Sequence, residues 1–233
     1  MKKIFGIGFI AILAVMVLTS SSPKKKKKSK MFRGIVTYDI SYDGDALTDL
    51  QKSKLPTTVS VKMYDGMSKF DEVMGPALQT TIINPKADKY TVLIEVGDKK
   101  AAYLGKYSDM NNDSTIQYTT VIDYSADTKI IAGYSCKKAI VTFTPKEGVD
   151  DEERMFTVYY SEELAGAEEN EDGFYKGIPG LLLESYQVSP GMVVKYTATE
   201  VKKGKVKDLD FLLPSDFKEF TDQEALMNYL MGK

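Results

Sequence analysis

Carboxylates and one thiol are the groups with which this chain could do chemistry. The sequence has 33 acidic residues, a single cysteine at Cys136 and no histidine. The absence of histidine excludes Ser-His-Asp and Cys-His nucleophile systems and the usual zinc sites. No phosphate loop, dinucleotide motif or Gly-x-Ser-x-Gly elbow is present either. We therefore expect a protein that is not an enzyme and that binds no metal or cofactor.

Two acidic clusters have the composition of weak cation sites. Asp109, Asn111 and Asp113 have the spacing of the first ligands of a calcium loop, but the glycine and the final glutamate of that loop are missing. A solvated turn is the better interpretation. The run from Glu168 to Asp172 is likewise expected to form a mobile surface loop. The spacing of the acidic residues does not single out a catalytic pair of carboxylates. Such a pair remains an alternative, because the chain has many acidic residues.

Cys136 has no partner for an intramolecular disulfide, so the fold must depend on its hydrophobic core. A lone cysteine in a strand is most often a small buried hydrophobe. A functional thiol is the alternative.

Aromatic side chains are the more suggestive feature of the composition. The chain has 15 tyrosines, 10 phenylalanines and 11 methionines but no tryptophan. If they line the concave face of a curved open sheet, the natural ligand is apolar, such as an acyl chain, and the C-terminal helix could act as a lid. The alternative is that these side chains fill the core.

Short strands separated by turns must position these residues. Runs rich in Thr, Val, Ile and Tyr recur about every ten residues, and the clearest hairpin joins residues 58–64 to 67–72 through Asp65-Gly66. Residues 205–213 are expected to add a last strand. Residues 221–231 predict a helix with Thr221 in a capping box. The pattern indicates a mainly β (α+β) fold, with about ten or eleven strands in an antiparallel sheet.

The least ordinary stretch is Gly-Ile-Pro-Gly-Leu-Leu-Leu-Glu-Ser-Tyr at residues 177–186. Pro179 fixes its own backbone, and we expect Gly180 to be left-handed at the third position of a type II turn. The strand that follows, residues 181–188, is apolar enough to be covered on both faces. Glu184 is the one residue in it that we expect to point toward water or a ligand.

Two motifs resemble those of the GLPGLI family, exported envelope proteins of Gram-negative bacteria. One is Gly177-Ile178-Pro179-Gly180, where isoleucine stands in place of the family's usual leucine. The other is the run from Asp127 to Ala139, which contains Ile131-Ala132-Gly133-Tyr134-Ser135-Cys136. Both motifs occur in the family's order, and the resemblance covers roughly residues 34–216.

The resemblance implies a LolA-like fold, a curved antiparallel half barrel with helices across its open side. We therefore predict a non-catalytic carrier or binding protein for a lipid or other hydrophobic ligand. The alternative is a cell-envelope module that binds a partner protein. The residues expected to line a ligand site are Tyr134, Leu181, Leu183 and Tyr186. The residues expected to have structural roles are Gly133, Cys136, Gly177, Ile178, Pro179 and Gly180.

Residues 1–22 have the layout of a secretory signal peptide, with a basic start and an apolar run, 4–18, that is short for a membrane span. An uncleaved anchor is the alternative, because no Ala-x-Ala site is present and Lys24 to Lys28 oppose translocation. Residues 23–30 predict a disordered basic linker, and residues 31–233 a single domain. The expected location is the periplasm or cell envelope, with membrane contact only through an uncleaved N-terminal segment.

Charge disfavours nucleic acid as a partner. Eight of the 31 basic residues lie in the first thirty positions, which contain no acid. The remainder has 23 basic and 33 acidic residues, a net charge of −10. Binding to phosphates needs a concentrated basic surface instead.

Overall fold

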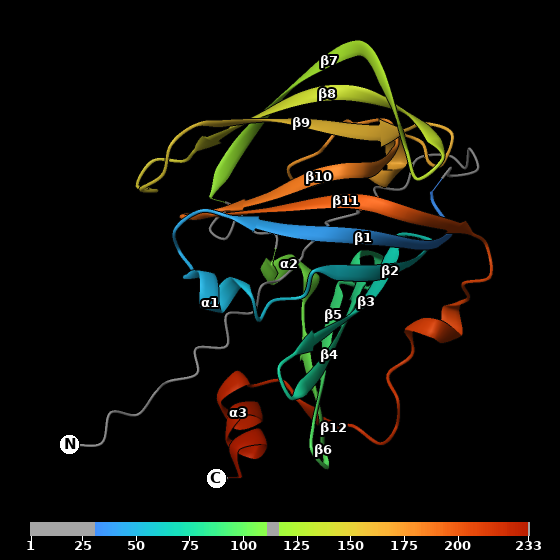
Figure 1. The fold of residues 1–233 in the computed structure, drawn as a ribbon. Helices are drawn as coiled ribbons and strands as arrows, with labels where there is room; N and C mark the ends of the chain where they lie inside the picture. Colours follow the sequence, from blue (N-terminus) through green and yellow to red (C-terminus); the bar gives the residue numbers. More distant parts are fainter. Residues whose placement is uncertain (1–30, 111–116, 233) are drawn as a thin grey trace.

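One curved sheet of twelve strands, open at one side, makes up most of the computed structural model (Figure 1). The structure describes residues 31–110 and 117–232, so the expected signal peptide and linker and part of the candidate calcium loop lie outside the described residues. The predicted mainly β, LolA-like half barrel is confirmed, with twelve strands instead of ten or eleven. The strands are β1 (Gly34–Asp43), β2 (Thr58–Tyr64), β3 (Met67–Met74), β4 (Ala77–Asn84), β5 (Lys89–Val96), β6 (Lys99–Gly105), β7 (Tyr118–Ile131), β8 (Tyr134–Pro145), β9 (Arg154–Ser161), β10 (Leu181–Ser189), β11 (Met192–Lys203) and β12 (Lys218–Phe220).

The strand order across the sheet is β12-β6-β5-β4-β3-β2-β1-β11-β10-β9-β8-β7. Neighbours are antiparallel except β12 and β6, which run parallel. Pairing of β1 with β11 joins two meanders, β1 to β6 and β7 to β11. The sheet does not close into a barrel, because its two end strands, β12 and β7, do not pair with each other. The described helices are α1 (Asp49–Lys52), α2 (Tyr107–Met110), α3 (Gln223–Met231) and the short 3₁₀ segments η1 (Pro85–Ala87), η2 (Ala167–Glu169) and η3 (Asp208–Phe211).

Local sequence patterns explain the clearest strands. In β1 the residues Val36, Tyr38 and Ile40 are buried and alternate with more exposed ones, as expected for a strand with one face in a core. Asp65 and Gly66 both have positive φ, 52° and 80°, which is the two-residue turn predicted between β2 and β3.

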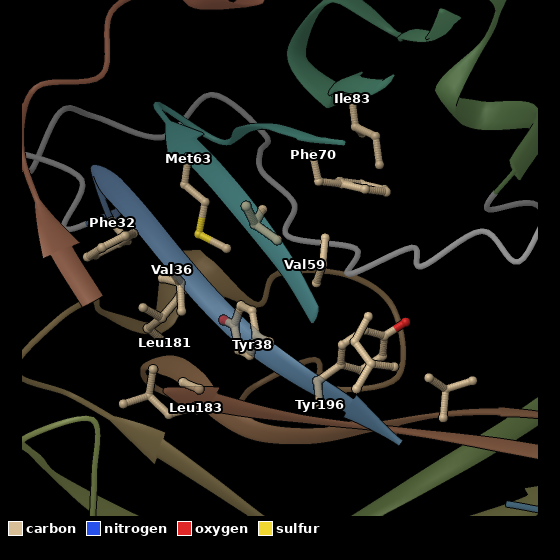
Figure 2. Packing of buried hydrophobic residues seen from close by; sticks show 14 of the residues in the cluster. Phe32, Val36, Tyr38, Val59, Met63, Phe70, Ile83, Leu181, Leu183 and Tyr196 are labelled. Carbon is tan, nitrogen blue, oxygen red and sulfur yellow. The ribbon is translucent and has the colours of Figure 1, made fainter. Parts of the chain in front are cut away.

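Both halves of the sheet share one hydrophobic core, which we call the inner core. Figure 2 shows how side chains from β2 and β3, such as Met63 and Phe70, face the same interior as Leu181 on β10. Helices α2 and α3 add Tyr107 and Leu226. Because side chains from opposite halves converge in a single cluster, this face of the sheet is the concave one.

The convex face carries two separate clusters. The first outer cluster lies on β7 to β10, includes Phe143 and Ile178, and is covered by the loop between β9 and β10. The second outer cluster lies on β4 to β6, includes Ile82, and is covered by the segment after β11. The prediction of a strand at residues 205–213 is wrong, because this segment buries Phe211 in the second outer cluster and forms η3 instead.

Helix α3 packs beside β6 and β12 at one edge of the half barrel (Figure 1). Its N-cap is Asp222, whose carboxylate accepts a hydrogen bond from the Ala225 N–H at 2.7 Å, so the cap lies one residue after the predicted Thr221. At its other end the Lys99 ammonium donates to two of the last carbonyls, at 2.9 and 3.0 Å. The helix is therefore fixed at both ends.

Candidate ligand-binding site

The four residues expected to line a ligand site do not share one surface. Leu181 and Leu183 are fully buried in the inner core, and Tyr134 packs at its margin. Tyr186 lies on the opposite face of the sheet, where its ring stacks on Phe156 with the centroids 4.4 Å apart. Packing therefore accounts for the positions of both leucines and of Tyr186.

Asn170 holds the Ile178-Pro179-Gly180 turn against the first outer cluster. Its side-chain amide donates to the carbonyls of Ile178 and Gly180 at 2.9 and 2.7 Å. Its main-chain carbonyl accepts from the Gly177 N–H at 3.0 Å. Asn170 is 1% exposed and Ile178 is completely buried. The most distinctive motif of the chain thus anchors a loop onto the sheet.

This turn is not the expected type II turn. Gly177 has a positive φ of 96°, but Gly180 is not left-handed. The Gly180 N–H donates to the Ile178 carbonyl at 3.0 Å, which forms a three-residue turn centred on Pro179. Position 180 favours glycine for a different reason, since a Cβ there would lie 2.8 Å from the carbonyl carbon of Ser161.

The second motif forms the tight hairpin between β7 and β8. Ala132 and Gly133 both have positive φ, 48° and 83°, and make a two-residue turn. Cys136 follows on β8 and is fully buried in the inner core. Burial raises the pKa of its thiol to about 11. Cys136 is therefore a packed, protonated side chain and not an activated nucleophile.

Glu184 does not point toward water as expected. It is 5% exposed, and its carboxylate oxygens lie 2.9 Å from the Lys129 ammonium and 3.1 Å from the Lys195 ammonium. The same two ammonium groups lie 4.8 Å from the ring centroid of Tyr159 and 5.6 Å from that of Tyr186. This ion cluster connects β10 to β7 and β11.

Glu169 was expected in a mobile surface loop, but it is 3% exposed. Its carboxylate accepts the Phe32 N–H at 2.7 Å. Burial is the main cause that raises the pKa of Glu169 to about 7, and the charge of Glu168 adds to the rise. This acid ties the loop between β9 and β10 to the start of the described chain.

Glu72 is an acid on the concave face that the sequence analysis did not single out. It follows Phe70 by two residues on β3, so both side chains lie on the inner face. Glu72 is 5% exposed, yet none of the described residues donates a hydrogen bond to it or forms an ion pair with it. Burial raises its pKa to about 7. The alternation Phe70-Asp71-Glu72 is the sequence signal that places an acid on this face.

Three tyrosines of the concave face have phenols that the charge of Glu72 affects, and we call Tyr42, Tyr90 and Tyr196 the tyrosine cluster. They come from β1, β5 and β11 and belong to or pack against the inner core. Burial raises the pKa of each phenol, and the negative charge of Glu72 adds to the rise in all three.

Two hydroxyls of the tyrosine cluster already use their protons. The Tyr42 hydroxyl donates to the Pro56 carbonyl at 2.7 Å. The Tyr196 hydroxyl donates more weakly to the side-chain carbonyl of Gln187, at 3.5 Å. Their oxygens, like the carboxylate of Glu72, are left to accept hydrogen bonds.

A groove of about 910 Å³ lies where β5 and β6 extend past the end of β12. Tyr90 and Tyr103 of the inner-core side border it, as do Ile82, Leu104 and Phe211 of the second outer cluster. Small-molecule pockets have volumes of roughly 300–1,000 Å³. The charged residues that also line the groove are Asp88, Lys89, Lys106, Asp109 and Glu219.

Within residues 31–110 and 117–232, no three metal-ligating side chains gather at one place. No helix in that part of the chain has the length and apolar character needed to cross a membrane.

The chain matches no protein-family model, and a search of curated proteins finds no relative.

Proposed function

We propose that this chain is an exported, non-catalytic binding or carrier protein for a lipid or other hydrophobic ligand. The observation that carries the proposal is the groove of about 910 Å³ at the end of β5 and β6. Aromatic and aliphatic side chains from both faces of the sheet border it, and five charged residues lie among them. Small-molecule sites combine apolar surface with polar groups that fix the orientation of the ligand.

Membership of the GLPGLI family and export to the periplasm or cell envelope belong to the same proposal. The order and spacing of the two motifs support the family, and the layout of residues 1–22 supports export. The LolA-like half barrel agrees with a carrier.

A non-catalytic role is supported by the state of the buried acids. Glu169 is engaged by a backbone N–H and Glu184 by two lysines. The raised pKa of Glu72 comes from its burial, with no contribution from a second carboxylate. A carboxylate mechanism would need two acids that converge on one substrate.

A cell-envelope module that binds a partner protein is the second candidate, and strand β7 favours it. β7 is an edge strand of the sheet. Its residues Val121, Tyr124 and Ile130 are 59%, 54% and 68% exposed. An exposed edge with apolar side chains is suited to pairing with a strand of another protein.

The test is to express the full chain in a bacterial periplasm and to compare its native and denatured masses, with solvent extraction of anything released. Leu212 lines the groove and is 60% exposed, so Leu212→Glu should spoil the groove and leave the fold intact. Leu209→Glu is the matched control, because Leu209 is 72% exposed on the same segment outside the groove.

We expect an apolar ligand on the native chain and on Leu209→Glu, and its loss from Leu212→Glu. A native chain that carries nothing and takes up no fluorescent fatty acid would remove the carrier proposal. That outcome would favour the partner-binding module.

A further inference from the structure

Lys89 and Lys106 face each other across strands β5 and β6 at one end of the groove. Both lysines are exposed, and both line the groove. The antiparallel ladder of these strands continues past its last regular pair, because the Tyr107 N–H donates to the Asp88 carbonyl at 3.4 Å. Lys89 and Lys106 are the next residues inward from this hydrogen bond. They are therefore directly opposite one another on one face of the sheet, with Cβ atoms roughly 5 Å apart.

Neither of these two ammonium groups has a hydrogen bond, an ion pair or an aromatic ring contact with any described residue. The lysines at the other end of β6 differ. Lys99 donates to two carbonyls of α3, and Lys100 forms ion pairs with Glu95 and Asp216. Like charges directly opposite each other destabilise a sheet. The groove thus contains two adjacent positive charges whose repulsion a bound anion would relieve.

Three acids also line the groove, and two of them are already engaged. The Asp88 carboxylate accepts hydrogen bonds from the Ser108 N–H at 2.7 Å and from the Ser108 hydroxyl at 3.1 Å. Asp109 likewise has an interaction within the chain. The third acid, Glu219 on β12, is level with the residue four positions before Lys106 on β6, which is roughly 13 Å away along the strand. The positive end of the groove is therefore remote from Glu219.

Apolar side chains lie between the lysine pair and Glu219. Leu104 is two residues before Lys106 on β6, so both side chains point to the same face of the sheet. Ile82 and Phe211 belong with Leu104 to the second outer cluster, and all three line the groove. An anionic group at the lysines could therefore continue into an apolar chain that lies along this cluster.

We propose that Lys89 and Lys106 bind the carboxylate of a fatty-acid-like amphiphile whose chain lies along the second outer cluster. A carboxylate has two accepting oxygens, one for each ammonium group. This inference rests on the proposed function, because it takes the groove to be the ligand site. The ligand class is thereby narrowed from any hydrophobic molecule to a single-chain anion.

The experiment titrates the full chain at about pH 8 with n-octanoate, n-octanol and acetate, and calorimetry measures each dissociation constant. Octanoate and acetate are ionised at this pH. Exposed ion pairs are individually weak, so two of them together should make octanoate bind about tenfold more tightly than octanol. Salt should weaken the binding of octanoate and not that of octanol. Acetate should not bind detectably, because it lacks the apolar chain.

The double variant Lys89→Met/Lys106→Met removes both charges and keeps apolar side chains of similar length. It should abolish the advantage of octanoate and leave octanol binding unchanged. Lys62→Met/Lys69→Met is the matched control, because these two lysines also face each other, across β2 and β3, and neither lines the groove. The control changes the net charge by the same amount and should keep the full advantage.

If octanol binds but octanoate binds no better, the lysine site is refuted and the carrier proposal stands. The same conclusion follows if Lys89→Met/Lys106→Met keeps the advantage or if the control variant loses it. Acetate that binds as tightly as octanoate would also refute the inference, because the lysines would then hold a free anion. If neither octanol nor octanoate binds, the carrier proposal itself fails.

Discussion

Gly180 lies so close to Ser161 that a Cβ added at position 180 would be 2.8 Å from both the carbonyl carbon and the carbonyl oxygen of Ser161. The next residue, Leu181, pairs with Ser161 at the start of the β9–β10 ladder, so the backbone there has little room to move. We expect Gly180→Ala to lower the free energy of unfolding by about 2 kcal/mol, the usual cost of overpacking. Urea denaturation of the native chain and of Gly180→Ala measures this difference in unfolding free energy.

The control for this substitution is Gly148→Ala. Gly148 has a φ of 85°, and nothing lies within 4 Å of the position that its Cβ would take. Only backbone strain opposes alanine there, which costs about 1 kcal/mol. A larger loss at Gly148 than at Gly180 would contradict the role assigned to the contact with Ser161.

Strand alternation and turn residues were enough to predict the fold class. The buried positions of β1 and the Asp65-Gly66 hairpin follow from local sequence, because a strand and its turn depend on neighbours a few residues away. The segment 205–213 looked like a strand for the same local reasons, but its apolar side chains pack onto the convex face instead.

The site could not be predicted in this way, because its contacts are between distant parts of the chain. Glu184 was expected to face water or a ligand because it is the one acid in an apolar strand, yet it pairs with Lys129 from β7 and Lys195 from β11. Leu183 and Tyr186 belong to one motif and were predicted to line the same ligand site. They lie on opposite faces of β10, so Leu183 packs in the inner core and Tyr186 against the first outer cluster. The burial of Glu72 likewise depends on packing between strands that are distant in the sequence.

The ion cluster at Glu184 predicts non-additive effects of its two lysines. Each lysine is partly exposed, and either one alone leaves the carboxylate with a partner. Lys129→Met and Lys195→Met should therefore each cost about 1 kcal/mol or less. The double variant should cost about 3 kcal/mol, because it leaves a buried carboxylate unpaired. A double-mutant cycle by chemical denaturation measures the coupling, and simple additivity of the two single effects would argue against a shared partner.

Cys136 should be unreactive in the folded protein. It is completely buried, and burial raises the pKa of its thiol to about 11, so almost no thiolate is present near neutral pH. We expect a thiol-specific reagent to label the native chain only at the rate at which it unfolds, and to label it fully in denaturant. Rapid labelling of the native chain would instead indicate an accessible, functional thiol.

Stability should fall as the pH rises from about 5 to 8. Burial raises the pKa of Glu72 and of Glu169 from 4.5 to about 7, so in this range the folded state holds protons that the unfolded chain has released. The stabilising effect is complete below pH 4.5 and is lost as the pH passes through 7. Linkage gives about 3 kcal/mol for each glutamate, most of it lost between pH 5 and 8. The phenols of Tyr42, Tyr90 and Tyr196 stay neutral between pH 5 and 8, because the pKa of each is raised far above this range.

Substitutions distinguish the pH dependence of stability caused by Glu72 and Glu169 from that caused by the other acidic residues. Asp127, Asp151 and Asp216 have a lowered pKa, so the stability they contribute is lost only as the pH falls below about 4. Glu72→Gln and Glu169→Gln should each flatten the decline in unfolding free energy between pH 5 and 8 by about half. Glu200→Gln, which changes an exposed carboxylate on β11, should leave the slope as it was. If stability rises with pH in the native chain, or if neither buried substitution changes the slope, then Glu72 and Glu169 do not hold protons in the folded state.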